Sequence, residues 1–140
     1  MENFEDLARQ LGYNQEELNS IIMFADKFYN SYYINKNKKI RHIDSPNKDL
    51  KAIQRFILYN VLSKFAVSPR ANGFIKNRGI RRNAQFHLDH KYILNLDIKD
   101  FFPSISQKQV YNALKHEINS DELAIKIAKL CTFRRYLPQG

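Results

Sequence analysis

The sequence predicts an α+β domain that is rich in helix and carries a short antiparallel hairpin and one buried strand. Apolar residues recur at helical spacing over most of the chain, in stripes that begin at Asn or Ser and in one case end at glycine. Residues 32–35 and 39–44 are β-prone runs separated by a polar turn, which indicates the hairpin. Residues 92–96 form a short apolar and β-branched run that is typical of a buried strand.

Composition limits the class of protein. A chain of 140 residues with 44% hydrophobic residues can build one compact core. No apolar run approaches the roughly 18 residues needed to span a membrane, and the first ten residues lack the apolar segment of a signal peptide. The single cysteine, Cys131, rules out an internal disulfide and suits a reducing compartment, so we expect a cytoplasmic protein.

The net charge of +9 is unevenly distributed along the chain. Residues 1–30 carry −4, so the remaining residues carry +13. A basic body predicts a polyanionic partner, for which nucleic acid is the first candidate. Aromatic residues lie among the basic ones and can stack on bases, although they can equally belong to the core.

The N-terminal segment, residues 1–31, predicts two helices. An apolar stripe that begins at Phe4 is ended by Gly12. Asn14 caps a second helix, whose apolar face extends to Tyr29. We expect this segment to be a packing element without chemistry of its own.

In the second run of the predicted hairpin, Lys39 and Arg41 alternate with Ile40. Both basic side chains therefore point to one face, which Ile43 shares. Cations on one face of a strand are often only a solvated edge that resists aggregation. A guanidinium also offers forked donors that match phosphate oxygens.

The middle of the chain predicts a helix followed by basic loops. Asn47 caps a long helix that is expected to reach about Phe65. Residues 68–90 follow, with turn chemistry at Pro69 and Gly73. Five cations within thirteen residues, with no acid among them, are the predicted nucleic-acid-binding residues: Arg70, Lys76, Arg78, Arg81 and Arg82. The residue types support contacts to phosphate that do not depend on base sequence.

The predicted strand begins at residue 92 and ends on Asp97, and Asp100 follows three residues later. A carboxylate at the end of a buried strand is costly unless it is paired or holds a cation. The plainer alternative is that Asp97 caps the helix that follows. Two further helices are predicted, over residues 107–118 and, capped by Ser120, up to Cys131.

Four segments, in order along the chain, resemble segments of one known family. Residues 41–46 (Arg-His-Ile-Asp-Ser-Pro) are similar to its basic fingers strand, and residues 83–87 (Asn-Ala-Gln-Phe-His) to its Asn-Ala-x-x-His segment. Residues 96–102 (Leu-Asp-Ile-Lys-Asp-Phe-Phe) are similar to motif A, and residues 137–140 (Leu-Pro-Gln-Gly) to the start of motif B. The sequence thus resembles the bacterial reverse transcriptases of the retron type.

This resemblance implies a right-hand polymerase fold, with an N-terminal helical segment over residues 1–31, fingers over 32–91 and the first part of the palm over 92–140. It implies RNA-directed DNA polymerase activity on a structured RNA template. Deoxynucleoside triphosphates would be the substrates, an RNA–DNA hybrid a bound partner and two Mg²⁺ ions the cofactor.

The resemblance also implies roles for single residues. Asp97 is the catalytic carboxylate and binds metal together with the backbone carbonyl of Ile98. Arg41 and Lys39 bind the triphosphate. The residues implied beside the nucleotide are Phe102, whose ring excludes a 2′-hydroxyl, and Gln139.

The roles of two aromatic and two polar residues need separate comment. Phe102 has the alternative of a plain core aromatic, and Phe101 is expected in the core. Asn83 and His87 belong to the family segment, but no mechanism follows from it. A structural, hydrogen-bonding role for His87 is favoured over metal binding, because nearby ligand types are confined to residues 89–90.

The resembled family takes two further carboxylates from a Tyr-x-Asp-Asp segment after motif B, and these 140 residues contain none. We therefore expect the chain to be the N-terminal part of a longer enzyme, inactive alone and binding Mg²⁺ at most weakly. Within the class, a group II intron-like reverse transcriptase is an alternative. Outside it, the alternatives are a non-catalytic RNA-binding module and a protein-interaction domain.

Overall fold

The structure is a computed structural model, and it describes residues 3–36 and 38–139. The chain divides into two compact units. We call the first the helical unit, which comprises Met1–Lys64 and Asp100–Gly140. We call the second the loop unit, which comprises Phe65–Lys99.

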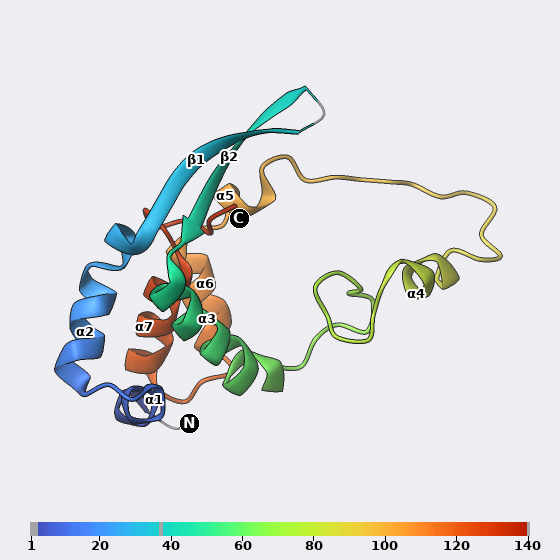
Figure 1. Ribbon diagram of the computed structural model, residues 1–140. Coiled ribbons are helices and arrows are strands. Elements are labelled where there is room, and N and C mark those ends of the chain that lie inside the picture. The colour runs from blue at the N-terminus through green and yellow to red at the C-terminus, as the bar shows by residue number, and fades with distance from the viewer. Residues whose placement is uncertain (1–2, 37, 140) are drawn as a thin grey trace. The chain divides into compact units, whose positions relative to one another are not determined.

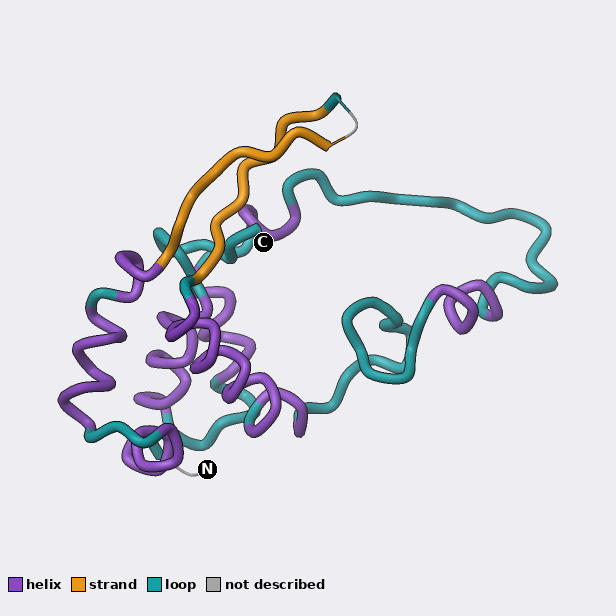
Figure 2. The backbone as a smooth tube through the Cα atoms, viewed as in Figure 1, coloured by secondary structure: helices purple, strands orange, loops and turns teal. Residues whose placement is uncertain are grey.

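Helices dominate, and one hairpin provides all the strand structure of the described residues (Figures 1 and 2). The predicted combination of helices with an antiparallel hairpin is therefore confirmed. The helical unit contains α1 (Phe4–Leu11), α2 (Gln15–Met23), a 3-10 turn (Ala25–Phe28), β1 (Tyr29–Lys36), β2 (Lys39–Pro46), α3 (Lys48–Asn60), a second 3-10 turn (Leu62–Lys64), α5 (Phe101–Ser104), α6 (Gln107–Leu114) and α7 (Asp121–Cys131). The loop unit contains α4 (Ile80–Gln85).

The helix boundaries follow from local capping chemistry. Asn14 and Glu17 form a capping box at the start of α2, and the side chain of Asn47 accepts a hydrogen bond from the Leu50 amide in α3. Gly12 ends α1 at φ 79°, a left-handed conformation that suits glycine. These predicted caps are confirmed, whereas α3 ends at Asn60, before the predicted Phe65.

The core of the helical unit is built around α7, which packs against α1, α2, α3 and α6. The buried residues of α7 are Leu123, Ala124, Ile127, Ala128 and Leu130. The amide of Gln54 in α3 donates to the Leu130 carbonyl at 2.7 Å and to the Tyr29 hydroxyl at 2.8 Å. This amide therefore joins α3, α7 and the start of the hairpin.

Two ionisable groups in this core have shifted pKa values. Burial raises the pKa of Tyr29 to about 12, although the hydrogen bond from Gln54 opposes the shift. Burial also raises the pKa of the Cys131 thiol to about 11. Both groups therefore stay neutral at physiological pH.

The hairpin is longer than its sequence pattern indicates. β1 and β2 pair antiparallel from Tyr29 opposite Pro46 to Lys36 opposite Lys39. Tyr29 is buried and stacks on Phe133 at 4.7 Å, so the strand begins inside the core, three residues before the predicted run. In the turn, Lys38 has φ 62°, while Asn37 lies outside the described residues.

The buried strand predicted over residues 92–97 is wrong. This segment is extended without strand pairing, and its apolar side chains are exposed, for example Leu94 at 81% and Leu96 at 84%. A strand needs a neighbour for its backbone hydrogen bonds, and among the described residues only β1 and β2 pair in a sheet. Phe101 was predicted in the core, yet it is 45% exposed.

The described residues contain no helix that is long and apolar enough to cross a membrane.

Candidate functional site

The basic face of the hairpin is as predicted. The register pairs Arg41 with Ile34 and Ile43 with Tyr32, and alternation places Lys39 on the same face. Ile40 lies on the opposite face. Arg41 and Lys39 are both exposed, so their charges are available to a ligand.

The opposite face of the hairpin carries a polar row that sequence reasoning missed. The Ser31 hydroxyl donates to Asp44 Oδ1 at 2.5 Å, and His42 Nδ1 lies 3.5 Å from Asp44 Oδ2. The His42 ring lies 5.0 Å from the ring of Tyr33, centroid to centroid. The contacts of Ser31 and Tyr33 follow from the antiparallel register, which pairs residue 31 with 44 and residue 33 with 42, whereas His42 and Asp44 are two residues apart on one face of β2.

The segment at residues 133–139 lies against the base of the hairpin. The Asp44 amide donates to the Gln139 carbonyl at 3.1 Å, and the Leu137 amide donates to the Ile105 carbonyl at 2.9 Å. The Gln107 amide donates to the Arg135 carbonyl at 2.7 Å. The backbone of Gln139 is thus hydrogen-bonded beside β2, which is the strand that carries Arg41. Gly140, the last residue of the predicted motif B segment, lies outside the described residues.

Phe101 and Phe102 form the start of α5. Their rings meet edge to face at 5.4 Å, and the side chains are 45% and 37% exposed. Asp100 occupies the N-cap position with φ 51°. The alternative in which Asp97 caps this helix is therefore not seen. Because Phe102 lies at the surface of the helical unit, its ring can meet a ligand.

Asp97 and Ile98 lie in the exposed extended segment of the loop unit. A carboxylate and a backbone carbonyl are the hard oxygen ligands that Mg²⁺ prefers. The described residues contain no group of three or more His, Cys, Asp and Glu side chains that could hold a metal ion. In ligand type, the Asp97 carboxylate and the Ile98 carbonyl are thus suited to Mg²⁺.

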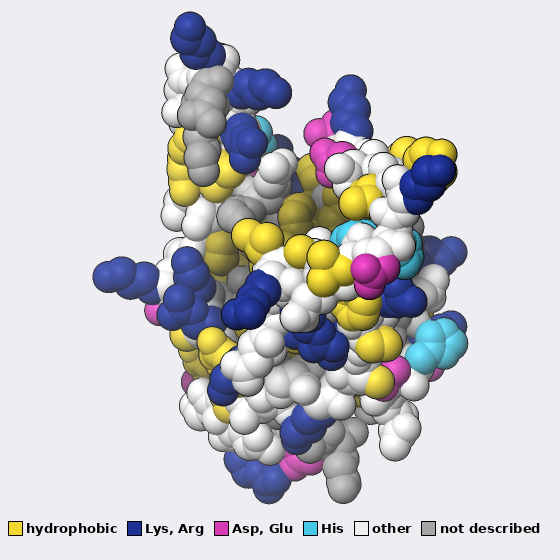
Figure 3. All heavy atoms as spheres, turned by 90° about the vertical axis from the view of Figure 1, so that its right-hand side faces the viewer, with side chains coloured by type: hydrophobic (Ala, Val, Ile, Leu, Met, Phe, Trp, Pro, Cys, Tyr) yellow, Lys and Arg dark blue, Asp and Glu magenta, His cyan; other side chains and the backbone are white. Residues whose placement is uncertain are grey.

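The cations of the loop unit differ in their surroundings. Arg70, Lys76 and Arg81 are exposed, whereas Arg78 and Arg82 are half-buried. The guanidinium of Arg70 lies over the ring of Phe86 at 5.2 Å. On the face shown in Figure 3, Lys and Arg side chains are spread widely and acidic side chains are few. This distribution matches the net charge of +9.

The structure gives Asn83 a contact that the sequence did not indicate. The side-chain amide of Asn72 donates to the Arg70 carbonyl at 2.9 Å and to Asn83 Oδ1 at 3.4 Å. Asn83 therefore links α4 to the turn at residues 68–72. His87 is exposed, and its backbone amide donates to the Ala84 carbonyl at 2.9 Å.

Comparison with known proteins shows which sequences this chain resembles. No protein-family model matches it. The chain is 35% identical to the retron Ec86 reverse transcriptase of Escherichia coli, in an alignment of 144 positions that covers 100% of the chain. It is 29% identical over 99% of its length to the retron Se72 reverse transcriptase of Salmonella heidelberg, and 33% identical over 79% to the retron Mx65 reverse transcriptase of Myxococcus xanthus. The chain spans 45%, 37% and 27% of these relatives, respectively.

Proposed function

Since this chain is related in sequence to retron reverse transcriptases along its whole length, we propose that it is part of an RNA-directed DNA polymerase. The enzyme copies a structured RNA template into DNA and holds the resulting RNA–DNA hybrid. The observation that carries the proposal is this similarity, which includes the segment around Asp97. In this assignment residues 1–31 are an N-terminal helical segment, residues 32–91 belong to the fingers and residues 92–140 to the palm.

In the proposed reaction the 3′-hydroxyl of the growing strand loses its proton and attacks the α-phosphorus of a deoxynucleoside triphosphate. A phosphodiester bond forms, and the bond to pyrophosphate breaks, so that pyrophosphate leaves. Magnesium, when bound, supplies charge stabilisation for the attacking and leaving oxygens. Asp97 and the Ile98 carbonyl would hold it. Exposed Arg41 and Lys39 on one face of β2 bind the triphosphate, for which the forked donors of Arg41 are suited.

Two residues of the helical unit are assigned to the nucleotide. The surface ring of Phe102 excludes a 2′-hydroxyl, and Gln139 lies beside the same nucleotide. The hydrogen bond from the Asp44 amide to the Gln139 carbonyl supports this assignment, because Gln139 then lies beside the strand that carries Arg41. The exposed cations Arg70, Lys76 and Arg81 contact phosphates of the RNA without reading its sequence.

The test is primer extension on an RNA template by the full-length protein. Asp97→Asn keeps the size of the side chain but removes its charge, so we expect extension to fall by about 100-fold or more. Asp100→Asn is the matched control: Asn tolerates the left-handed backbone at that position, so activity should be kept. Extension by Asp97→Asn at the wild-type rate would exclude Asp97 as a metal ligand.

A non-catalytic RNA-binding module is a second candidate, which the exposed cations of the loop unit favour. The same experiment separates the two functions. A full-length wild-type protein that binds RNA but does not extend a primer would support the binding module over the polymerase.

A further inference from the structure

Arg78 is bonded to the backbone of its own loop. Its Nη1 donates to the Ser68 carbonyl at 2.7 Å and to the Ala71 carbonyl at 2.8 Å, and the side chain is half-buried. The Arg78 amide also donates to the Ile75 carbonyl at 3.1 Å. One guanidinium nitrogen thus closes the loop from residue 68 to residue 78.

The start of this loop is held to α4 by separate contacts. Arg70 lies over the ring of Phe86, and the amide of Asn72 bridges the Arg70 carbonyl and Asn83. Residues 68–72 therefore form a fixed base, to which Arg78 ties the far end of the loop.

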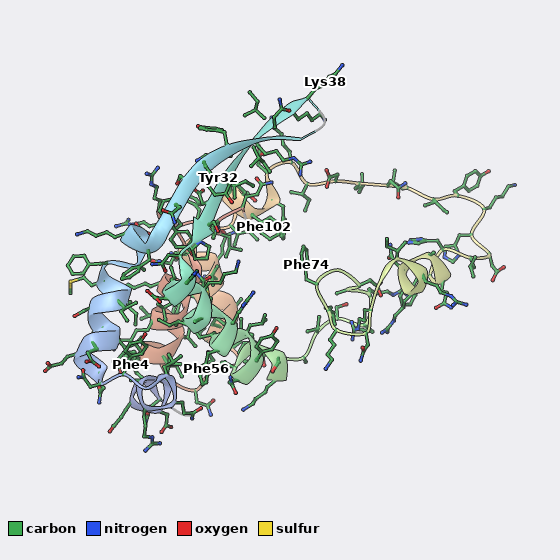
Figure 4. The ribbon with its side chains drawn as sticks, in the orientation of Figure 1. Phe4, Tyr32, Lys38, Phe56, Phe74 and Phe102 are labelled. Atoms are coloured by element: carbon green, nitrogen blue, oxygen red, sulfur yellow. The ribbon has the colours of Figure 1, made fainter. Side chains whose placement is uncertain are left out.

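The tip between these ends, residues 73–77, has an unfavourable backbone. Phe74 and Asn77 have φ 59° and φ 62°, in a region that residues other than glycine seldom occupy. Such conformations persist only where the surroundings hold them. The tip presents a fully exposed aromatic ring at Phe74, visible in Figure 4, and an exposed ammonium at Lys76.

We propose that Arg78 is a positioning residue of the RNA interface: it holds the tip so that Phe74 stacks on a base while Lys76 binds phosphate. In this proposal Arg78 acts through the loop, because both hydrogens of its Nη1 are directed at backbone carbonyls and the side chain is half-buried. An aromatic ring next to a cation suits a single-stranded nucleic acid. This inference rests on the proposed function and deepens it, since it separates residues that shape the interface from those that touch RNA.

A double-mutant cycle in the full-length protein tests the proposal. The ligand is an unstructured single-stranded RNA oligonucleotide, and its Kd is measured over a series of salt concentrations. Arg78→Gln is made in the wild type and in the double variant Phe74→Ala/Lys76→Ala, which lacks the two side chains of the tip and is called the tip-less background. We expect Arg78→Gln to weaken binding about 10-fold in the wild type and less than about 2-fold in the tip-less background, because it acts through the tip.

Arg81→Gln is the matched control, because Arg81 is an exposed arginine of the same unit. It should weaken binding by the same factor in both backgrounds and flatten the salt slope by about 0.7. An equal loss for Arg78→Gln in both backgrounds, with the same flattening, would overturn the proposal and make Arg78 a phosphate ligand.

Amide hydrogen exchange shows whether the variant acts where it is expected to act. Exchange at Ala71 and Arg78, whose amides are hydrogen-bonded within the loop, should accelerate in Arg78→Gln while α3 and α7 keep their protection. Unchanged exchange at those amides would also overturn the proposal. If the Kd of the wild type did not change with salt concentration, RNA binding by this unit through phosphates would be excluded, and the inference would fail with it.

Discussion

At the scale of single residues, Phe101 and Phe102 are neighbours in one short helix with different proposed roles. Phe102→Val in the full-length enzyme should open the volume that a 2′-hydroxyl needs and raise the use of ribonucleotides, because the energy of steric overlap rises steeply as atoms approach one another. Phe101→Val should leave sugar choice unchanged. Since Phe101 is exposed, its loss should also change stability by only about 0.5 kcal/mol.

The measurement is the ratio of kcat/KM for a matched ribonucleotide and deoxynucleotide on one template. If Phe102→Val stays active with an unchanged ratio, the steric role belongs to another residue.

The pattern of residue types predicted which side chains share a face of a strand, but not the contacts within irregular loops. The shared face of Lys39 and Arg41 follows from strand alternation alone. The bonds of Arg78 to carbonyls seven and ten residues earlier depend on the path of an irregular loop, which no periodicity encodes. The roles of Asp97 and Gln139 came from resemblance, and they stay proposals.

At the scale of elements, α7 is the helix around which the core of the helical unit is packed. Ile127 is fully buried, so Ile127→Ala should lower the free energy of unfolding by about 2–5 kcal/mol through lost burial and the cavity left behind. Ile125 lies on the same helix but is 43% exposed, and Ile125→Ala should cost under about 1 kcal/mol. Denaturant unfolding checks both, and equal losses would show that α7 is not the centre of the core.

Helix ends could be predicted from the sequence where they depend on residues close together in the chain. The caps at Asn14 and Asn47 and the stop at Gly12 were correct because each depends on residues within one turn. The strand at residues 92–97 failed because a strand depends on a partner, and an apolar run does not say whether one is present. The hairpin extended beyond its pattern because Tyr29 is held by stacking on Phe133, a contact distant in sequence.

At the scale of the whole molecule, alkaline pH should destabilise the protein. The pKa of Tyr29 is about 12 in the folded state and about 10 when unfolded, so between these values the unfolded chain releases a proton that the folded protein keeps. The stability that Tyr29 contributes is therefore full below about pH 10 and is lost up to about pH 12, by on the order of 2 kcal/mol. Cys131, with its pKa at about 11, adds to the loss.

Urea unfolding at a series of pH values measures this effect. Tyr29→Phe keeps the ring that stacks on Phe133 but cannot ionise, so its stability should fall less steeply above pH 10. An identical decline in both proteins would mean that Tyr29 ionises as freely in the folded state as in the unfolded one.

The attachment of the hairpin has a mechanical consequence. Near its base, the Asp44 amide donates to Gln139, the Asn47 amide donates to the Phe28 carbonyl at 2.7 Å, and Tyr29 stacks on Phe133. From there the strands run out to Lys38, labelled at the far end in Figure 4. At about 3.3 Å per residue, eight residues make an arm of about 26 Å, so a rotation of about 10° at the base sweeps its end through about 4–5 Å. The hairpin is thus a long arm that is anchored in the core at its base. A slight repacking of Phe133 or Gln139 would therefore produce a larger displacement of the cations near its far end.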